Sequence, residues 1–166
     1  IFHNKVDDAI ESVRLAPPHP YAGQSQSQNI GEIIYKGIEL GITAMPTDTL
    51  EIGANYTFLE TESREDYDGG WPRHKGVIYA KWQAAPGFTV IPVLELSDNR
   101  RTANSAGTGY VETGAYELLS LKLAYRIAPQ WDVSLTARNL LDKNYQFSDG
   151  YPQEGRNFLI STRYQF

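Results

Sequence analysis

The segment at residues 156–166 constrains the fold of this chain more than any other. It reads RNFLISTRYQF, with side chains alternating in character up to Phe166. A period of two predicts a β-strand with one apolar face. Because an apolar band edged by aromatic side chains is typical of outer-membrane strands, we expect this face to meet lipid. The residues that share it are Phe158, Ile160, Thr162, Tyr164 and Phe166.

The same alternation recurs along the chain and predicts an all-β fold. Between Thr49 and Glu62, for example, apolar side chains from Leu50 to Phe58 alternate with Glu, Gly, Asn and Thr. Helical periodicity is almost absent, so we expect about eight strands. Their predicted ranges are 1–13, 36–42, 49–62, 75–83, 88–96, 116–125, 131–140 and 156–166.

The predicted connections alternate between short and long. The short ones each contain a proline, as tight turns often do, and lie at 45–48, 84–87 and 128–130. The long ones lie at 14–31, 63–74, 97–114 and 141–155. Because consecutive strands would be antiparallel neighbours, all short turns fall at one end of the sheet. This asymmetry is typical of an antiparallel up-and-down transmembrane β-barrel.

Composition and charge argue against several other classes. Cysteine is absent, and 15 Lys plus Arg against 20 Asp plus Glu give a net charge of -5, which disfavours a nucleic-acid partner. No run of about 18 apolar residues predicts a membrane-spanning helix. His3, His19 and His74 lie too far apart in sequence for the usual spacing of metal ligands. We expect no metal and no cofactor.

The region from Asn139 to Phe166 resembles the C-terminus of TonB-dependent outer-membrane receptors. Upstream, the segments 35–41 and 73–75 look like the glycine-glutamate strand and a loop-to-strand junction of that family. The resemblance implies that residues 1–166 form roughly the last third of a 22-stranded barrel. The family's plug domain is absent from these residues. The matching C-terminal motif comprises Asn139, Asp142, Tyr145, Gly150, Tyr151, Pro152, Gly155, Arg156 and Phe166.

The resemblance also implies a function and a location. It implies a receptor fragment in the bacterial outer membrane that serves TonB-dependent uptake of an iron chelate, such as a ferric siderophore. Corrinoid, haem and glycan are the alternative ligands. The implied partners are the TonB complex, acting through the missing N-terminal plug region, the outer-membrane assembly machinery, reading the C-terminal strand, and the lipid bilayer. No enzyme is implied.

Aromatic and cationic side chains in the long loops are the candidate ligand contacts. A ferric siderophore is often anionic and ring-bearing, so arginine beside tyrosine or tryptophan would suit it through charge and stacking. These candidates are Tyr67, Trp71, Arg73, Arg100, Arg101, Tyr110 and Tyr151. The glycines and proline of the C-terminal motif have turn roles that need no ligand. Asp142 and Arg156 flank one loop, where an exposed ion pair would contribute about 0 to 1 kcal/mol.

Two other classes of protein are also compatible with this sequence. One is a stand-alone eight-stranded outer-membrane barrel with a structural or adhesive role, since eight strands suffice to close a barrel. The other is a barrel enzyme, which no nucleophile motif supports. If the chain is a piece of a longer protein, its outer strands at 1–13 and 156–166 predict edge pairing with a second copy unless the barrel closes.

Overall fold

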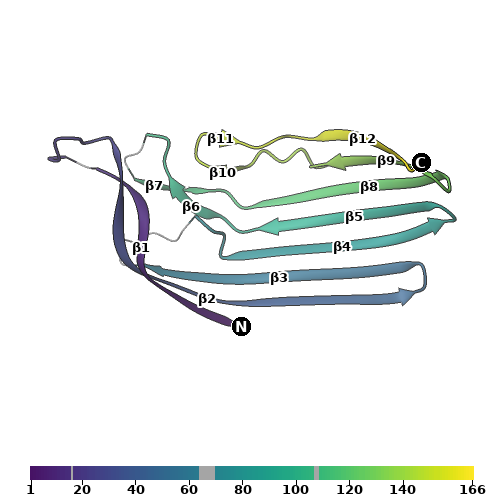
Figure 1. Ribbon diagram of the computed structural model, residues 1–166, viewed down its shortest axis with the longest axis horizontal. Helices are drawn as coiled ribbons and strands as arrows, with labels where there is room; N and C mark the ends of the chain where they lie inside the picture. Colours follow the sequence, from purple (N-terminus) through teal and green to yellow (C-terminus); the bar gives the residue numbers. More distant parts are fainter. Residues whose placement is uncertain (16, 64–69, 107–108) are drawn as a thin grey trace.

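The protein is an open antiparallel sheet with two small hairpins at one end (Figure 1). The computed structural model describes residues 1–15, 17–63, 70–106 and 109–166. The eight-stranded sheet has the order β1-β2-β3-β4-β5-β8-β9-β12 in this part of the chain. Within the described residues, no helix has the length and hydropathy needed to cross a bilayer.

Each strand of the main sheet pairs with its neighbours in chain order, which confirms the predicted up-and-down topology. The main strands are β1 (Phe2–Arg14), β2 (Ser25–Thr47), β3 (Leu50–Ser63), β4 (His74–Ala85), β5 (Phe88–Ser97), β8 (Tyr116–Ala128), β9 (Trp131–Arg138) and β12 (Asn157–Tyr164). Two hairpins, β6 (Arg100–Ala103) with β7 (Tyr110–Thr113) and β10 (Gln146–Ser148) with β11 (Tyr151–Pro152), lie within connections that the sequence predicted as loops.

The predicted connection at 14–31 is wrong over much of its length. β2 begins at Ser25, and its first residues pair with β1, from Asn29 opposite Ile10 to Ser25 opposite Arg14. The polar SQSQN stretch lacks the alternation that marks a half-buried strand. Backbone hydrogen bonds to β1 hold it extended all the same, because a ladder needs no apolar side chain.

The first short turn also lies later than predicted. Asp48 and Thr49 form it, and Pro46 lies inside β2, where the pairing with β3 is irregular between Ala44 and Thr47. A proline is tolerated there because an irregular position has no ladder bond for its missing N–H to make. The other two turns lie within their predicted ranges, at Pro86–Gly87 and at 129–130.

The strand register collects apolar side chains on one face of the sheet. One row across it runs through Ile160, Leu135, Leu123, Val90, Trp82 and Leu50. This face is solvent-accessible in the isolated chain, with Ile160 76% exposed. From Trp82 to His74, which lies opposite Phe58, β4 covers about 26 Å at 3.3 Å per residue. These nine residues lie in the range of about 9–11 that a tilted transmembrane strand needs.

The opposite face is mostly polar, as the lumenal side of a barrel would be. Almost no core exists, since the buried hydrophobic residues in the described part are Ala9, Ile33, Tyr116 and Ala137. β1 and β12 form the two sides of the sheet, and no ladder joins them in the described residues. This open sheet is a barrel segment and differs from the closed eight-stranded barrel that the sequence left possible.

Candidate functional site

The long connections gather at the end of the sheet opposite the tight turns (Figure 1). The connection after β5 is fixed at its start, where the amide of Asp98 donates to the carbonyl of His74 at 2.9 Å. It is fixed at its base by buried Thr113, whose hydroxyl donates to the carbonyl of Arg100 at 3.3 Å. The β6–β7 hairpin is therefore held against the strand ends.

The β6–β7 hairpin also docks on the β10–β11 connection. The amide of Ser105 donates to Oδ2 of Asp149 at 2.8 Å, and the amide of Asp149 donates to Oγ1 of Thr102 at 3.4 Å. The hydrogen bond from the Ser105 amide lowers the pKa of Asp149, because it stabilises the charged carboxylate. Two connections that are more than 40 residues apart thus form one unit.

An aromatic cluster built around Arg100 lies beneath this unit. The Arg100 guanidinium carbon is 4.9 Å from the ring centroid of Phe147 and 5.8 Å from that of Tyr116. Tyr116 is 3% exposed, and its hydroxyl donates to Oε1 of Glu95 at 3.1 Å while accepting from Arg100 at 3.3 Å. The ring of Tyr145 packs 4.8 Å from that of Tyr116, and burial raises the pKa of Tyr145.

The sequence did not single out Tyr116 and Phe147 as site residues. Tyr116 merely opened a predicted strand, and Phe147 stood alone in a predicted loop. No spacing rule links a residue at a strand start with one in a distant connection, so only the folded chain shows that Tyr116 and Phe147 meet.

A hollow of about 390 Å³ opens between the C-terminal end of β3, the residues just before β4 and the β6–β7 hairpin. Four of the predicted contacts line it: Trp71, Arg73, Arg100 and Arg101. The remaining lining residues are Leu59, Glu60, Thr61, Asp98, Asn99 and Glu112. Three guanidinium groups and one indole alongside three carboxylates can bind a ligand that carries both charged groups and rings.

Ion pairs and hydrogen bonds hold several of these side chains. Nη2 of Arg73 lies 2.7 Å from Oε1 of Glu60, and Nδ2 of Asn99 donates to Oε2 of Glu112 at 2.6 Å. Trp71, in contrast, is 60% exposed. The hollow therefore has fixed charged walls and one accessible indole.

The other three predicted contacts have different positions. Tyr110 is next to the hollow, because its ring lies 5.1 Å from the guanidinium carbon of Arg101. Tyr151 belongs to β11, is 71% exposed and does not line the hollow. Tyr67 lies outside the described residues.

The C-terminal motif residues organise the base of the last long connection. Buried Asn139 donates through Nδ2 to the carbonyls of Lys143, at 2.9 Å, and Glu154, at 3.2 Å. The expected ion pair is present, with Nη2 of Arg156 3.8 Å from Oδ2 of Asp142. Pro152 lies in β11, next to Tyr151, and the ring of Phe166 packs 5.3 Å from that of Tyr164.

Two glycines of the motif are constrained, Gly150 by its positive φ and Gly155 by the space around it. Gly150 has a φ of 80°, and an added Cβ would lie 3.4 Å from Cβ of Ser105. At Gly155 an added Cβ would lie 3.0 Å from Oδ1 of Asp142. Gly150 therefore serves the backbone conformation of the connection, and Gly155 serves its packing.

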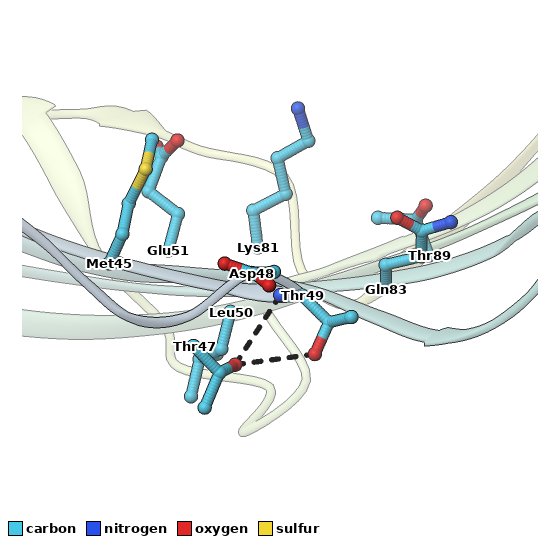
Figure 2. A pocket seen from close by; sticks show the side chains of 9 residues that line it. All are labelled: Met45, Thr47, Asp48, Thr49, Leu50, Glu51, Lys81, Gln83 and Thr89. Atoms are coloured by element: carbon cyan, nitrogen blue, oxygen red, sulfur yellow. Dashed lines mark hydrogen bonds between the residues drawn. The ribbon is translucent and has the colours of Figure 1, made fainter.

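A second hollow, of about 220 Å³, lies at the tight-turn end of the polar face (Figure 2). Its lining residues are Met45, Thr47, Asp48, Thr49, Leu50, Glu51, Lys81, Gln83 and Thr89. The hydroxyl of Thr47 accepts from the amide of Thr49 at 3.4 Å within the turn. None of the predicted contacts lines this hollow, which belongs to the opposite end of the sheet.

An open antiparallel sheet with one lipid-facing side and clustered long connections defines a segment of an outer-membrane β-barrel. Residues 1–140 match the family described as TonB dependent receptor-like, beta-barrel, and the chain belongs to this family of outer-membrane receptors.

Known proteins similar to this chain include a ferric-pyoverdine receptor and a vitamin B12 transporter. The ferric-pyoverdine M114 receptor PbuA of Pseudomonas sp. (strain M114) is 26% identical in an alignment 161 residues long, which covers 86% of this chain and 19% of PbuA. The vitamin B12 transporter BtuB of Vibrio cholerae is 32% identical over 63 residues, which are 38% of this chain and 10% of BtuB. The chain therefore spans about a fifth or less of these curated relatives.

A solved structure shows the same fold. The ferripyoverdine receptor of the outer membrane of Pseudomonas aeruginosa, bound to ferripyoverdine, superposes with a TM-score of 0.72 at 19% identity. The match covers 99% of this chain and 24% of the receptor.

Proposed function

We propose that this chain is the C-terminal part of the barrel of an outer-membrane receptor for TonB-dependent uptake of a ferric siderophore. Its membership of the receptor family and its similarity to the ferric-pyoverdine receptor PbuA support this assignment. The TonB complex would act through a plug region outside residues 1–166. The outer-membrane assembly machinery would recognise the C-terminal strand that ends at Phe166.

The proposed ligand follows from the hollow at the loop end. Its volume of about 390 Å³ lies in the usual range of small-molecule sites, about 300–1,000 Å³. Arg73 is held by Glu60 and Arg100 by Tyr116, so both guanidinium groups are positioned before a ligand arrives. Trp71 offers an exposed face for stacking on a chelating ring. An anionic, ring-bearing iron chelate matches these groups.

Trp71 provides a direct test of this proposal. The other two tryptophans of residues 1–166 are Trp82 and Trp131. They lie on the apolar face near the tight turns, at the end of the strands opposite the loops. We would titrate the full-length encoded protein with ferric pyoverdine, ferric enterobactin, haem and cyanocobalamin and record tryptophan emission. A ferric siderophore should change the emission, and Trp71→Phe should remove most of that change. No binding of either ferric siderophore would contradict the proposed ligands.

Arg73→Gln tests the role of charge in the hollow. Loss of a hydrogen bond to a charged group costs about 1.5–3 kcal/mol, so the dissociation constant should rise about 10- to 150-fold. Lys36→Gln is the matched control, because Lys36 lies on the apolar face and has an equally close carboxylate partner, Glu62 at 2.7 Å. Equal binding by both variants would remove Arg73 from the site.

A corrinoid is the second candidate ligand, because BtuB is among the relatives. Saturable binding of cyanocobalamin in the same titration, without binding of the ferric siderophores, would replace the first candidate. Uptake that persists in cells lacking TonB would contradict the proposed transport class for either ligand.

A further inference from the structure

Arg100 belongs both to the hollow at the loop end and to the aromatic cluster beneath the loop hairpins. Its guanidinium carbon lies 4.9 Å from the ring centroid of Phe147, yet neither Phe147 nor Tyr116 lines the hollow. Phe147 lies on β10, in the connection between β9 and β12. Arg100 therefore links the hollow to a connection that contributes no lining residue of its own among the described ones.

The positive charge of Arg100 has no carboxylate partner in the described part of the chain. Arg73, in the same hollow, lies 2.7 Å from a carboxylate oxygen. The three carboxylates that line the hollow bind other groups, and they are Glu60, Asp98 and Glu112. An anionic group of a ligand would therefore supply the counter-charge that the protein gives to Arg73 and leaves out at Arg100.

Arg100 also has hydrogen-bond donors to spare. Both side-chain hydrogen bonds that it makes to described residues start from Nη2, which donates to Oγ of Ser97 and to the hydroxyl of Tyr116, each at 3.3 Å. A guanidinium carries further N–H groups on Nε and Nη1. No buried side-chain nitrogen or oxygen of the described residues lacks a hydrogen bond, so these two atoms are accessible. An anion in the hollow can accept from them.

Phe147 holds the guanidinium without using those donors. The face of an aromatic ring attracts a cation through its quadrupole and needs no N–H group in return. The hairpin that carries Phe147 is fixed in turn, because the amide of Ser105 donates to Oδ2 of Asp149 at 2.8 Å. The place of the Arg100 guanidinium thus depends on the docking of the β10–β11 hairpin.

We propose that Phe147 is a positioning residue for Arg100. Through the docked β10–β11 hairpin it holds the guanidinium where the anionic group of an iron chelate in the hollow can bind it. The inference deepens the proposed function and rests on it, since it takes the hollow as the ligand site. Affinity for an anionic chelate is then set partly by a side chain that does not touch the ligand.

Titration of the full-length encoded protein with ferric pyoverdine and with ferric enterobactin, read from tryptophan emission, tests the role of Phe147. Phe147→Leu should raise the dissociation constant about three- to tenfold, as expected for loss of a partly exposed cation–π contact. Phe147→Tyr keeps an aromatic ring and should stay within about twofold of the unaltered protein. Because Phe147 is 40% exposed, leucine at this position opens no buried cavity.

Arg100→Gln separates positioning from a general loosening of the loops. In that background Phe147 has no guanidinium to hold, so Phe147→Leu should change the dissociation constant by less than about twofold. The same added loss as in the unaltered protein would contradict the inference. So would unchanged affinity in Phe147→Leu, or an equal loss in Phe147→Tyr. These three results leave the proposed function standing, whereas an unaltered protein that binds neither chelate would contradict both.

Discussion

The backbone amide of Arg156 donates a 2.8 Å hydrogen bond to Oδ1 of Asp142, fourteen residues earlier in the chain. Asp142 has a φ of 52°, and its own amide donates to the carbonyl of Asn139 at 2.9 Å. One carboxylate therefore closes the connection between β9 and β12. The accompanying ion pair is longer, at 3.8 Å, and lies at the surface.

Asp142→Asn should cost less than about 1 kcal/mol, because an amide oxygen can still accept from Arg156 and exposed ion pairs contribute little. Asp142→Ala should cost about 2–3 kcal/mol, since it loses a charge-assisted hydrogen bond and puts Ala at positive φ. Urea unfolding in detergent micelles measures both values. Equal losses for the two variants would show that the charge dominates.

Asn139→Ala should destabilise the protein by about 2–4 kcal/mol. Asn139 is 4% exposed, has a φ of 47° and makes side-chain hydrogen bonds to the carbonyls of Lys143 and Glu154, while accepting from the Lys143 amide at 2.8 Å. Each lost bond costs about 1 kcal/mol, and the left-handed backbone adds about another. Asn139→Gly removes the side chain but relieves the backbone, so it should cost about 1 kcal/mol less. The same urea titration compares the two variants.

Gly53→Ala should cost about 1–3 kcal/mol through overpacking. An added Cβ at Gly53 would collide with the ring of Tyr79, which covers this glycine and donates through its hydroxyl to Glu51 at 3.1 Å. Gly76→Ala is the control, because its added Cβ would have no neighbour closer than Asn55 O at 3.9 Å. Adding Tyr79→Leu to Gly53→Ala should recover part of the loss. Similar costs at both glycines would contradict the collision.

The docking of the two loop hairpins should weaken in acid. The pKa of Asp149 lies below its usual 3.8 because the Ser105 amide binds the carboxylate. A depressed pKa stabilises the fold at a pH above the usual value, and that contribution disappears as the pH falls through the folded-state value. Spin labels on Ala106→Cys and Gln153→Cys should therefore report a constant distance from pH 7 to about 5. The distance should broaden as the pH falls below 3.8 and through the lowered pKa of Asp149. The distance in an Asp149→Asn background should not change over this range.

The strands were predictable because their signal is local. Alternation and turn residues located all eight strands of the main sheet, and the register confirms the shared face of Phe158, Ile160, Thr162 and Tyr164. The long β2 was not predictable from its polar first residues, since pairing with β1 holds them. The two hairpins were missed because each is too short to show a period.

The candidate site could be predicted only as a set of residue types in loops. Arg and Trp in the long connections pointed to the loop end, and four of the seven candidates do line one hollow. Tyr151 is also an aromatic residue in a long connection, but it does not line this hollow. The β10–β11 hairpin places it on the surface instead.

The sequence by itself determined the two faces of the sheet and the ends at which turns and loops lie, because side-chain period and turn chemistry act over a few residues. Tertiary structure decided which distant side chains meet. Strand register brings Lys122 and Leu159 into one row, and hairpin docking brings Asp149 to Ser105. These contacts depend on backbone hydrogen bonds between segments far apart in the chain, and no local pattern of residues specifies such pairs.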